Sequence, residues 1–333
     1  MVNGIDHKTT WSFLLGALLL PALPAQAQFA CATNAGAITI TGYSGAGGAV
    51  AIPATINRLP VTSIGNSAFY WITNMTSVAI PPGVASIQDN AFEKCLNLTR
   101  VSFPAGLAGI GDFAFFDCIR LTNVAIPASV AGIGDNAFAY CASLTSVTFS
   151  NGLAGIGACA FEKCTSLAAV TLPDTLASIG NGAFDGCASL TNLTIPGTLA
   201  VIGDYTFHAC SSLAAVRLPA SLTSIGSYAF GACSSLTSLT LPAGLATIEV
   251  QAFAGCRSLT NLILPASLTN IGDGAFENCA SLATVYFMGN APRSPSAFSG
   301  DSKAVFFYPP AIPPSAPHPA PPKTPGTGAV LEK

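Results

Sequence analysis

Apolar and polar positions recur along this chain in a unit of 23 residues. The unit that begins at residue 84 reads VASIQDNAFEKCLNLTRVSFP, and the other units align with it without insertion or deletion across ten repeats. In nine of them the Phe is followed three positions later by Cys, and the first has Ile72 instead. A fixed period between about 20 and 30 residues is typical of solenoids, so the pattern predicts stacked coils that share one core.

Within each unit, the alternation of side chains predicts a strand. Val101 and Phe103 are expected inside and Arg100 and Ser102 outside, and Pro104 then ends the strand because it cannot donate a ladder hydrogen bond. The Gly-Asp-x-Ala-Phe segment is expected to form a short helical turn. The predicted fold is a leucine-rich-repeat-like right-handed coil with a parallel β-sheet on one face and short helical turns on the other.

The ends of the chain depart from the repeat. The apolar core at 11–20, followed by Ala25-Gln26-Ala27, predicts a secretory signal peptide that is cut after Ala27. After residue 30 no apolar run approaches the ~18 residues that a membrane-spanning helix needs. The predicted organisation is a signal peptide (1–27), an N-terminal cap (28–60), ten repeats (61–290), a C-terminal cap (291–308) and a Pro-rich disordered tail (309–333).

The motif I-G-x-x-A-F-x-x-C-x-x-L-x-x-V-x-[IL]-P resembles the BspA-type leucine-rich repeat of secreted and surface proteins, and residues 61–290 match it nearly throughout. The resemblance implies a curved solenoid displayed outside the cell, where it binds proteins of a host or a neighbouring cell. It brings no shared catalytic residues. Only 8% of residues are charged and the net charge is -3, which argues against nucleic acid and anionic membranes as partners.

The cysteine ladder admits three interpretations. Disulfides between neighbouring coils are disfavoured, because the ladder has an odd number of members, Ile72 fills one slot and parallel inward side chains are badly oriented for a bridge. A metal site is disfavoured because no C-x-x-C pair exists. Buried free thiols that act as small hydrophobes are favoured. Cys31 and Cys159 lie outside the ladder, and Cys159 is a candidate exposed thiol.

A second ladder consists of Asp89, Asp112 and Asp135, with Asp204 and Asp273 in the same slot. Capping of the following turn by the Asp oxygen is favoured over calcium binding, since Asn and Ser also fill the slot. The repeat body has one histidine, His208, which is expected to be an ordinary surface residue. No nucleophile elbow or phosphate-binding loop is present, so we expect no enzymatic activity, catalytic residue, cofactor or metal.

Function is therefore expected at the surface positions that the repeat leaves variable. The candidate partner-binding residues are two outward charges and a Tyr on the strands, and aromatic residues near the early turns: Arg100, Arg217, Tyr286, Tyr70, Trp71, Phe113, Phe116 and Tyr140. Partial burial between coils is the competing explanation for the aromatic residues. The favoured function is an exported, non-enzymatic protein that mediates protein–protein interaction or adhesion at the cell surface. A structural spacer of the envelope or matrix and a glycan-binding module are the alternatives.

Overall fold

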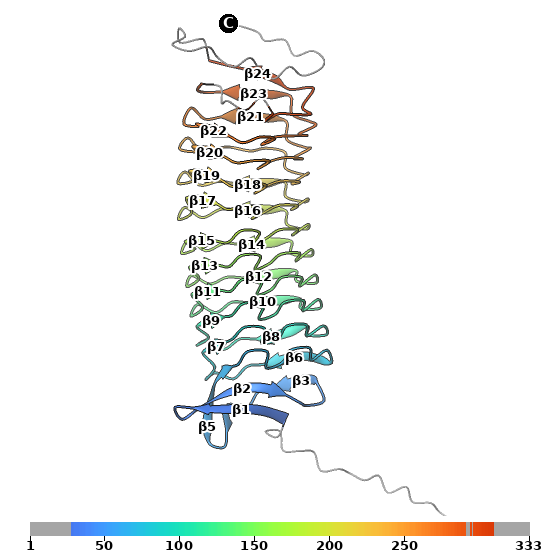
Figure 1. Cartoon of the computed structure of the whole chain (residues 1–333), viewed down its shortest axis with the longest axis vertical. Helices are drawn as coiled ribbons and strands as arrows, with labels where there is room; N and C mark the ends of the chain where they lie inside the picture. Colours follow the sequence, from blue (N-terminus) through green and yellow to red (C-terminus); the bar gives the residue numbers. More distant parts are fainter. Residues whose placement is uncertain (1–27, 291–293, 295, 310–333) are drawn as a thin grey trace, which may run out of the picture.

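The computed structural model describes residues 28–290, 294 and 296–309 of the chain. The predicted signal peptide and all but the first residue of the predicted Pro-rich tail lie outside these residues. The coils stack into one long column (Figure 1). Across the described ranges, no helix is long and apolar enough to cross a membrane.

One wall of the column consists of short parallel strands that carry the Val and Leu positions of the repeat. Equivalent residues of successive coils pair directly, as Val124 does with Val147 and Val147 with Val170. We call these strands the first wall: β3 (Gly48–Ala51), β6 (Met75–Ala79), β8 (Arg100–Ser102), β10 (Asn123–Ala125), β12 (Ser146–Thr148), β14 (Ala169–Thr171), β16 (Asn192–Thr194), β18 (Ala215–Arg217), β21 (Asn261–Leu264), β23 (Thr284–Phe287) and β24 (Val305–Phe307).

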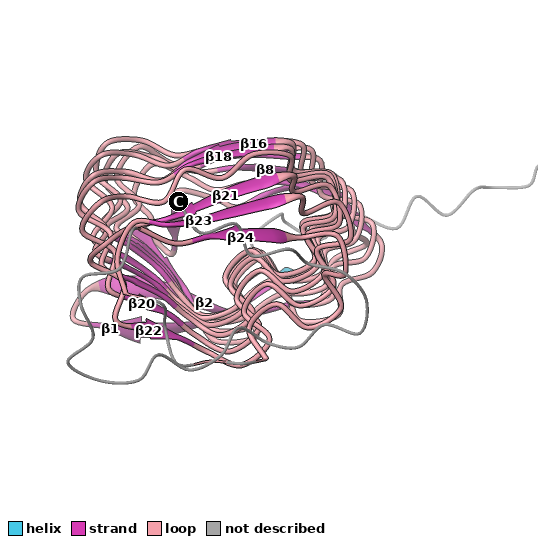
Figure 2. Ribbon diagram, turned by 90° about the horizontal axis from the view of Figure 1, so that it is seen from above, coloured by secondary structure: helices cyan, strands magenta, loops and turns pink. Residues whose placement is uncertain are grey.

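A second wall of parallel strands stands beside the first, as the view from above shows (Figure 2). The sequence predicted one sheet, and this was wrong because the Ile slots also lie in register: Ile87 pairs with both Ile64 and Ile110. The strands of the second wall are β2 (Ala37–Tyr43), β5 (Leu59–Ile64), β7 (Ser86–Ile87), β9 (Gly109–Ile110), β11 (Gly132–Ile133), β13 (Gly155–Ile156), β15 (Ser178–Ile179), β17 (Val201–Ile202), β19 (Ser224–Ile225), β20 (Thr247–Ile248) and β22 (Asn270–Ile271).

The segment after each Ile does not form a helical turn, and the described residues contain no α-helix. In the second repeat, Asn90 and Lys94 have φ of 59° and 57°, which a right-handed helix excludes. Their amides donate to the next coil, to the carbonyls of Asp112 and Phe116 at 2.9 and 2.8 Å. Amides therefore alternate between bonds within the turn and bonds between coils. We call residues 65–72 and their equivalents every 23 residues, up to 272–279, the turn edge.

The interior is filled by one column of phenylalanine rings. Ten Phe residues, Phe69 to Phe276, are fully buried and stack coil on coil with ring centroids 4.8–5.5 Å apart. Phe298 continues the column, 5.3 Å from Phe276. A buried Phe contributes on the order of 1.5–3 kcal/mol, so the column is a principal source of stability.

The nine ladder cysteines are free and buried beside this column. Each thiol donates a hydrogen bond, at 3.2–3.4 Å, to the carbonyl oxygen of the Phe residue 26 positions earlier. Burial raises the pKa of eight of these thiols, from Cys118 to Cys279, and to about 12 at Cys210 and Cys256, so these eight stay protonated. The prediction of buried packing residues is confirmed, and the structure adds a polar role that the spacing did not reveal.

The two ends of the column are closed differently. At the N-terminal end, β1 (Phe29–Asn34) pairs with β2 in an antiparallel hairpin, and β4 (Thr55–Ile56) forms a second hairpin with β5. At the C-terminal end, β24 pairs in parallel with β23. Asp301 lies buried just before β24, and neither of its carboxylate oxygens has a hydrogen-bond partner.

Candidate binding surfaces

The residues predicted to bind a partner lie on two different surfaces of the column. Three of them extend outward from the first wall: Arg100 in β8, Arg217 in β18 and Tyr286 in β23. The others lie on the turn edge: Tyr70, Trp71, Phe113, Phe116 and Tyr140. The sequence therefore predicted two separate candidate surfaces.

The two arginines of the first wall are not brought together. In the strand register, Arg100 lies opposite Ser77 and Asn123 of the neighbouring coils. Arg217 lies five coils further along, opposite Thr194, and belongs to the adjacent column of outward positions. The outward residues between them are small and uncharged. The two charges thus do not form a joint binding site on this wall.

Tyr286 belongs to a small apolar patch at the C-terminal end of the first wall. Its ring stacks on Phe307 of β24 at 4.7 Å, and its register partner Ile263 is 56% exposed. Tyr286 itself remains 42% exposed. This end of the wall is the only part of its outer face, within the described residues, where large apolar side chains meet.

The turn edge groups the early aromatic residues in two clusters. The first aromatic group is Tyr70 and Trp71, whose ring centroids are 6.0 Å apart, and Trp71 is 55% exposed. The ammonium of Lys94, from the next coil, lies 5.8 and 5.4 Å from these two ring centroids. It also pairs with Glu93 at 3.3 Å, and this hydrogen bond raises the pKa of Lys94.

The second aromatic group is Phe113, Phe116 and Tyr140. Phe116 lies 5.5 Å from Phe113 and 5.3 Å from Tyr140, so one continuous apolar surface spans two coils. The Tyr140 hydroxyl donates to Glu162 at 3.2 Å, and the charge of Glu162 raises the pKa of Tyr140. The two Phe rings are half-buried and Tyr140 is 41% exposed, so burial between coils accounts for only part of their surface.

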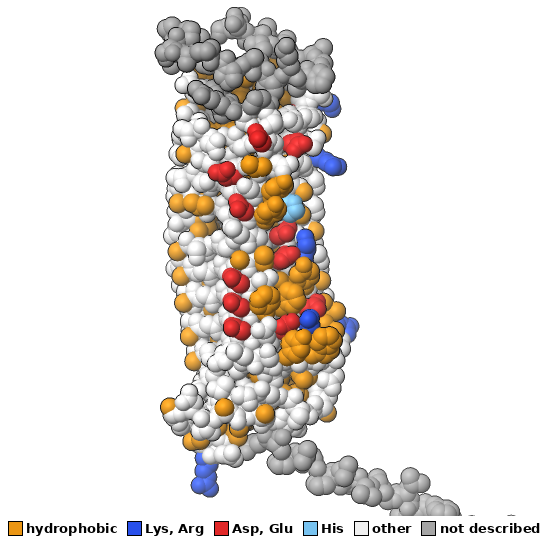
Figure 3. Space-filling view, in the orientation of Figure 1, with side chains coloured by type: hydrophobic (Ala, Val, Ile, Leu, Met, Phe, Trp, Pro, Cys, Tyr) orange, Lys and Arg blue, Asp and Glu red, His pale blue; other side chains and the backbone are white. Residues whose placement is uncertain are grey.

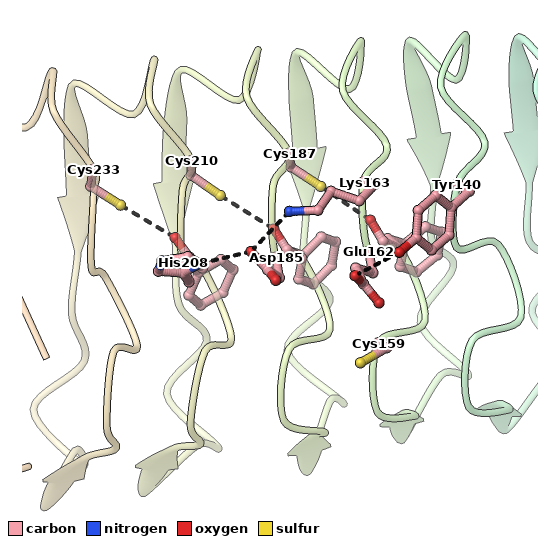
Figure 4. Close-up of polar contacts among 12 residues, drawn as sticks. Tyr140, Cys159, Glu162, Lys163, Asp185, Cys187, His208, Cys210 and Cys233 are labelled. Atoms are coloured by element: carbon pink, nitrogen blue, oxygen red, sulfur yellow. Dashed lines mark hydrogen bonds and ion pairs between the residues drawn. The ribbon is translucent and has the colours of Figure 1, made fainter. Parts of the chain in front are cut away.

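A third aromatic group was missed by sequence reasoning. Tyr205 and Tyr228 stack at 4.8 Å, and the ring of His208 lies edge-on to Tyr205 at 5.5 Å. The His208 ring nitrogen Nδ1 lies 2.9 Å from Asp185, which also pairs with Lys163 at 3.7 Å (Figure 4). The signal was present, because Tyr205 fills the slot of Phe113 four periods later.

Carboxylates gather on the same surface, where red side chains lie beside orange hydrophobic ones along one face of the column (Figure 3). Of the described carboxylates, only Asp174 and Asp301 lie away from the turn edge. The carboxylates on the turn edge are Asp89, Glu93, Asp112, Asp117, Asp135, Glu162, Asp185, Asp204, Glu249, Asp273 and Glu277. The only lysines or arginines among the described turn-edge residues are Lys94 and Lys163.

The Asp ladder fastens one coil to the next. The Oδ1 atom of Asp89 accepts from the amide of Asp112 at 3.0 Å, and that of Asp112 accepts from Asp135 at 2.7 Å. Asn181 does the same for the amide of Asp204 at 3.1 Å, so the bond needs no charge. The predicted acceptance of backbone amides is found, but the amide belongs to the following coil. At the end of the ladder, the hydroxyls of Ser296 and Ser294 lower the pKa of Asp273.

Cys159 is half-buried on the turn edge, with its sulfur 3.8 Å from the Asn181 carbonyl oxygen. Burial, followed by the negative charge of Glu162, raises the pKa of this thiol. A raised pKa lowers the thiolate fraction at neutral pH and so slows alkylation and oxidation. Among the described residues, no three His, Cys, Asp or Glu side chains are arranged to hold a metal ion.

The stacked parallel coils and their variable turn edge define a β-solenoid of the leucine-rich-repeat class. The sequence matches the family model described as "BspA type Leucine rich repeat region (6 copies)" over residues 62–191 and 177–304. The chain belongs to this family, as the resemblance of its repeat motif predicted.

Solved structures resemble the column over most of its length. The pneumococcal vaccine antigen PcpA is 21% identical, with a TM-score of 0.56, and the match covers 85% of this chain and 92% of that protein. A leucine-rich cell surface protein from Faecalibacterium prausnitzii is 27% identical, with a TM-score of 0.49 and coverage of 86% and 94%. No curated protein matches the sequence. The likeness to the pneumococcal antigen supports the fold.

Proposed function

We propose that this chain is an exported, non-enzymatic repeat protein that binds other proteins at the cell surface and so contributes to adhesion. Its partner contacts the turn edge, chiefly through the three aromatic groups. Arg100, Arg217 and Tyr286 on the first wall form a secondary candidate surface.

The observation that carries this proposal is the grouping of large, partly exposed aromatic side chains on the turn edge. Trp71, Phe113, Tyr140, Tyr205 and Tyr228 all have φ between 55° and 62°. This left-handed region favours Gly and Asn and disfavours bulky residues. The φ is positive in these two slots in all ten coils, whether they hold Gly and Asn, as at Gly182 and Asn90, or other residues, as at Ala209, Lys94 and Gln251.

The repeat therefore fixes this conformation, and the aromatic residues occupy it although Gly and Asn suit it better. Exposed Trp and Tyr are also the side chains most often found as anchors of protein interfaces. Export is supported by the signal peptide that the sequence predicts over residues 1–27, and a binding role by membership of the repeat family.

A crosslinking pull-down from cell-surface extracts, with the exported form of the chain as bait, tests the proposal. The triple variant Trp71→Asn, Phe116→Ala, Tyr140→Asn is expected to lose the partner while its thermal unfolding stays cooperative. The double variant Arg100→Ala, Arg217→Ala is the control for the first wall and is expected to retain it. Capture that is unchanged in both variants contradicts binding by either surface.

A further inference from the structure

The first aromatic group already holds a cation that the chain itself supplies. The ammonium of Lys94 lies within 6 Å of both ring centroids and pairs with Glu93 on the same surface. The quadrupole of an aromatic face attracts a cation, and a neighbouring carboxylate adds to this attraction. The turn edge thus contains one internal example of an aromatic surface and a carboxylate that together bind a cation.

The second aromatic group offers the same elements without the cation. Phe113 follows Asp112 directly, and Asp135 lies one coil further on. Over the described part of the chain, no Lys or Arg other than Lys94 lies over an aromatic ring. The rings of Phe113, Phe116 and Tyr140 therefore remain free to receive a cation from outside.

The carboxylates beside this group are held in a row. Asp89, Asp112 and Asp135 are all exposed and lie one coil apart, at about 4.8 Å spacing. Oδ1 of each accepts a backbone amide of the next coil, which fixes the row. Like charges at this spacing repel one another. A partner that brings positive charge relieves this repulsion.

The remaining cations of the described chain are paired or lie outside the turn edge. Lys163 is paired with Asp185. The others lie away from the turn edge, at Arg58, Arg100, Arg120, Arg217, Arg257 and Lys303. The turn edge is thus an aromatic surface with excess negative charge, although the net charge of the whole chain is only -3.

We infer that the partner of the turn edge is an extended, Arg- or Lys-bearing protein segment that lies along the column and places its cations on the second and third aromatic groups, between the carboxylates. This inference rests on the proposed function and adds the chemistry of the partner. Arginine suits the site best, because its planar guanidinium stacks on a ring and bonds a carboxylate at the same time.

The spacing of the two aromatic groups sets the length of the segment. Phe113 and Tyr205 occupy the same slot four periods apart, which corresponds to about 19 Å along the column. An extended chain covers this distance in about six residues. Two arginines six positions apart can therefore reach both groups at once.

A fluorescence-anisotropy titration of the exported chain with the labelled peptide Arg-Gly-Ser-Gly-Ser-Gly-Arg tests the inference. The peptide is expected to bind, and the same peptide with Glu in place of both Arg is not. Phe116→Leu, which keeps an apolar side chain but removes the ring, is expected to weaken binding about three-fold. Asp112→Asn, which retains the amide-accepting oxygen as Asn181 does, is expected to weaken it about two- to five-fold.

The matched control is Asp174→Asn, which removes one exposed carboxylate outside the turn edge. It is expected to leave the affinity within experimental error. Equal weakening by Asp174→Asn and Asp112→Asn means diffuse charge attraction, and the inference then falls. It also falls if the arginine peptide does not bind. A third contradicting result is that neutral chitohexaose or cellohexaose binds and Phe116→Leu abolishes this binding, because the turn edge is then a glycan surface.

The pull-down separates this inference from the proposed function. If the arginine peptide fails while the wild-type chain still captures a protein that the triple aromatic variant loses, the proposed function stands and only the cationic partner is wrong. If neither the peptide nor any protein is retained by the wild-type chain, both are wrong.

Discussion

The turn edge and the outer face of the first wall follow the same 23-residue period but carry different chemistry. Outward positions of the first wall are mostly Ser, Thr, Ala and Asn, whereas the turn edge holds the exposed aromatic groups and nearly all described carboxylates. On the wall, each outward side chain lies directly against its equivalents in the coils before and after, as Thr148 does against Thr171. Small and β-branched residues suit such close cross-strand contacts.

On the turn edge, backbone hydrogen bonds between coils hold the chain regardless of the side chain. The amides of Asn90, Phe113, Cys159 and Gly182 all donate to the next coil at 2.8–2.9 Å, although their side chains have nothing in common. The backbone therefore tolerates variation here at a modest conformational cost. A uniform scaffold can thus confine most of its variable chemistry to one surface, where backbone hydrogen bonds join successive coils.

The largest expected contrast is between a buried ring and a turn-edge ring. Phe161→Ala is expected to lower the free energy of unfolding by about 3–5 kcal/mol, because it empties a fully buried position between two stacked rings. Phe116→Ala, at a half-buried position, is expected to lower it by about 1 kcal/mol or less. Urea denaturation measures both. Equal losses of unfolding free energy in the two variants contradict the comparison. Since coils couple to their neighbours, hydrogen exchange in Phe161→Ala is expected to rise first in the adjacent coils.

The next contrast is between a buried carboxylate and the exposed ones of the turn edge. Burial, with a smaller contribution from the charge of Glu277, raises the pKa of Asp301 from 3.8 to about 7. The folded state thus holds a proton that the unfolded state releases above pH 4. Stability is expected to fall as pH rises from about 4 to 7, by up to about 3 kcal/mol, and then to level off. Thermal unfolding across this range measures the effect.

Asp301→Asn is the control for this pH dependence. Its amide cannot ionise, so its unfolding temperature is expected to vary less between pH 4 and pH 7 than that of the wild-type chain. A wild-type slope that survives in Asp301→Asn assigns the pH dependence to other groups.

The interior was predictable from the repeat in the sequence, whereas the path of the turn was not predictable. The Phe and Cys columns follow from spacing alone, because a fixed period places equivalent residues above one another. The helical turn was wrongly expected, since an Asp just before Ala91-Phe92 is typical of a helix N-cap and nothing local reveals the positive φ of Asn90 and Lys94. Hydrogen bonds between coils determine the path of the turn instead.

The candidate surfaces were predictable only in part. Aromatic residues in consecutive coils were visible as Phe113, Phe116 and Tyr140. The third group was missed because His208 was judged alone, although its partners Asp185 and Tyr205 occupy neighbouring slots of the same turn edge. Reading all variable slots as columns, coil by coil, would have found it.

A smaller contrast concerns the two kinds of cysteine. Cys164→Ala is expected to lower the free energy of unfolding by about 1–2 kcal/mol, because it removes a buried group and the hydrogen bond to the Phe138 carbonyl. Cys159→Ala is expected to change it by less than about 0.5 kcal/mol. In the native chain, a maleimide reagent is expected to label Cys159 slowly and Cys164 only after unfolding, with mass spectrometry of the digest as the readout. Labelling of both at the same rate contradicts the assignment.

The smallest expected effect on stability is also the most informative about function. Tyr205→Asn removes a ring that stacks on Tyr228, at a loss of about 0.5–1.5 kcal/mol, but relieves a φ of 56° that Asn accepts readily. The two effects nearly cancel, so the unfolding midpoint is expected to move little, whereas binding of the arginine peptide weakens. Thr171→Asn is the matched change on the first wall and is expected to destabilise by up to about 1 kcal/mol without affecting binding, because Asn is disfavoured in strands. The reverse outcome, a destabilised but fully binding Tyr205→Asn, would assign the turn-edge ring to packing.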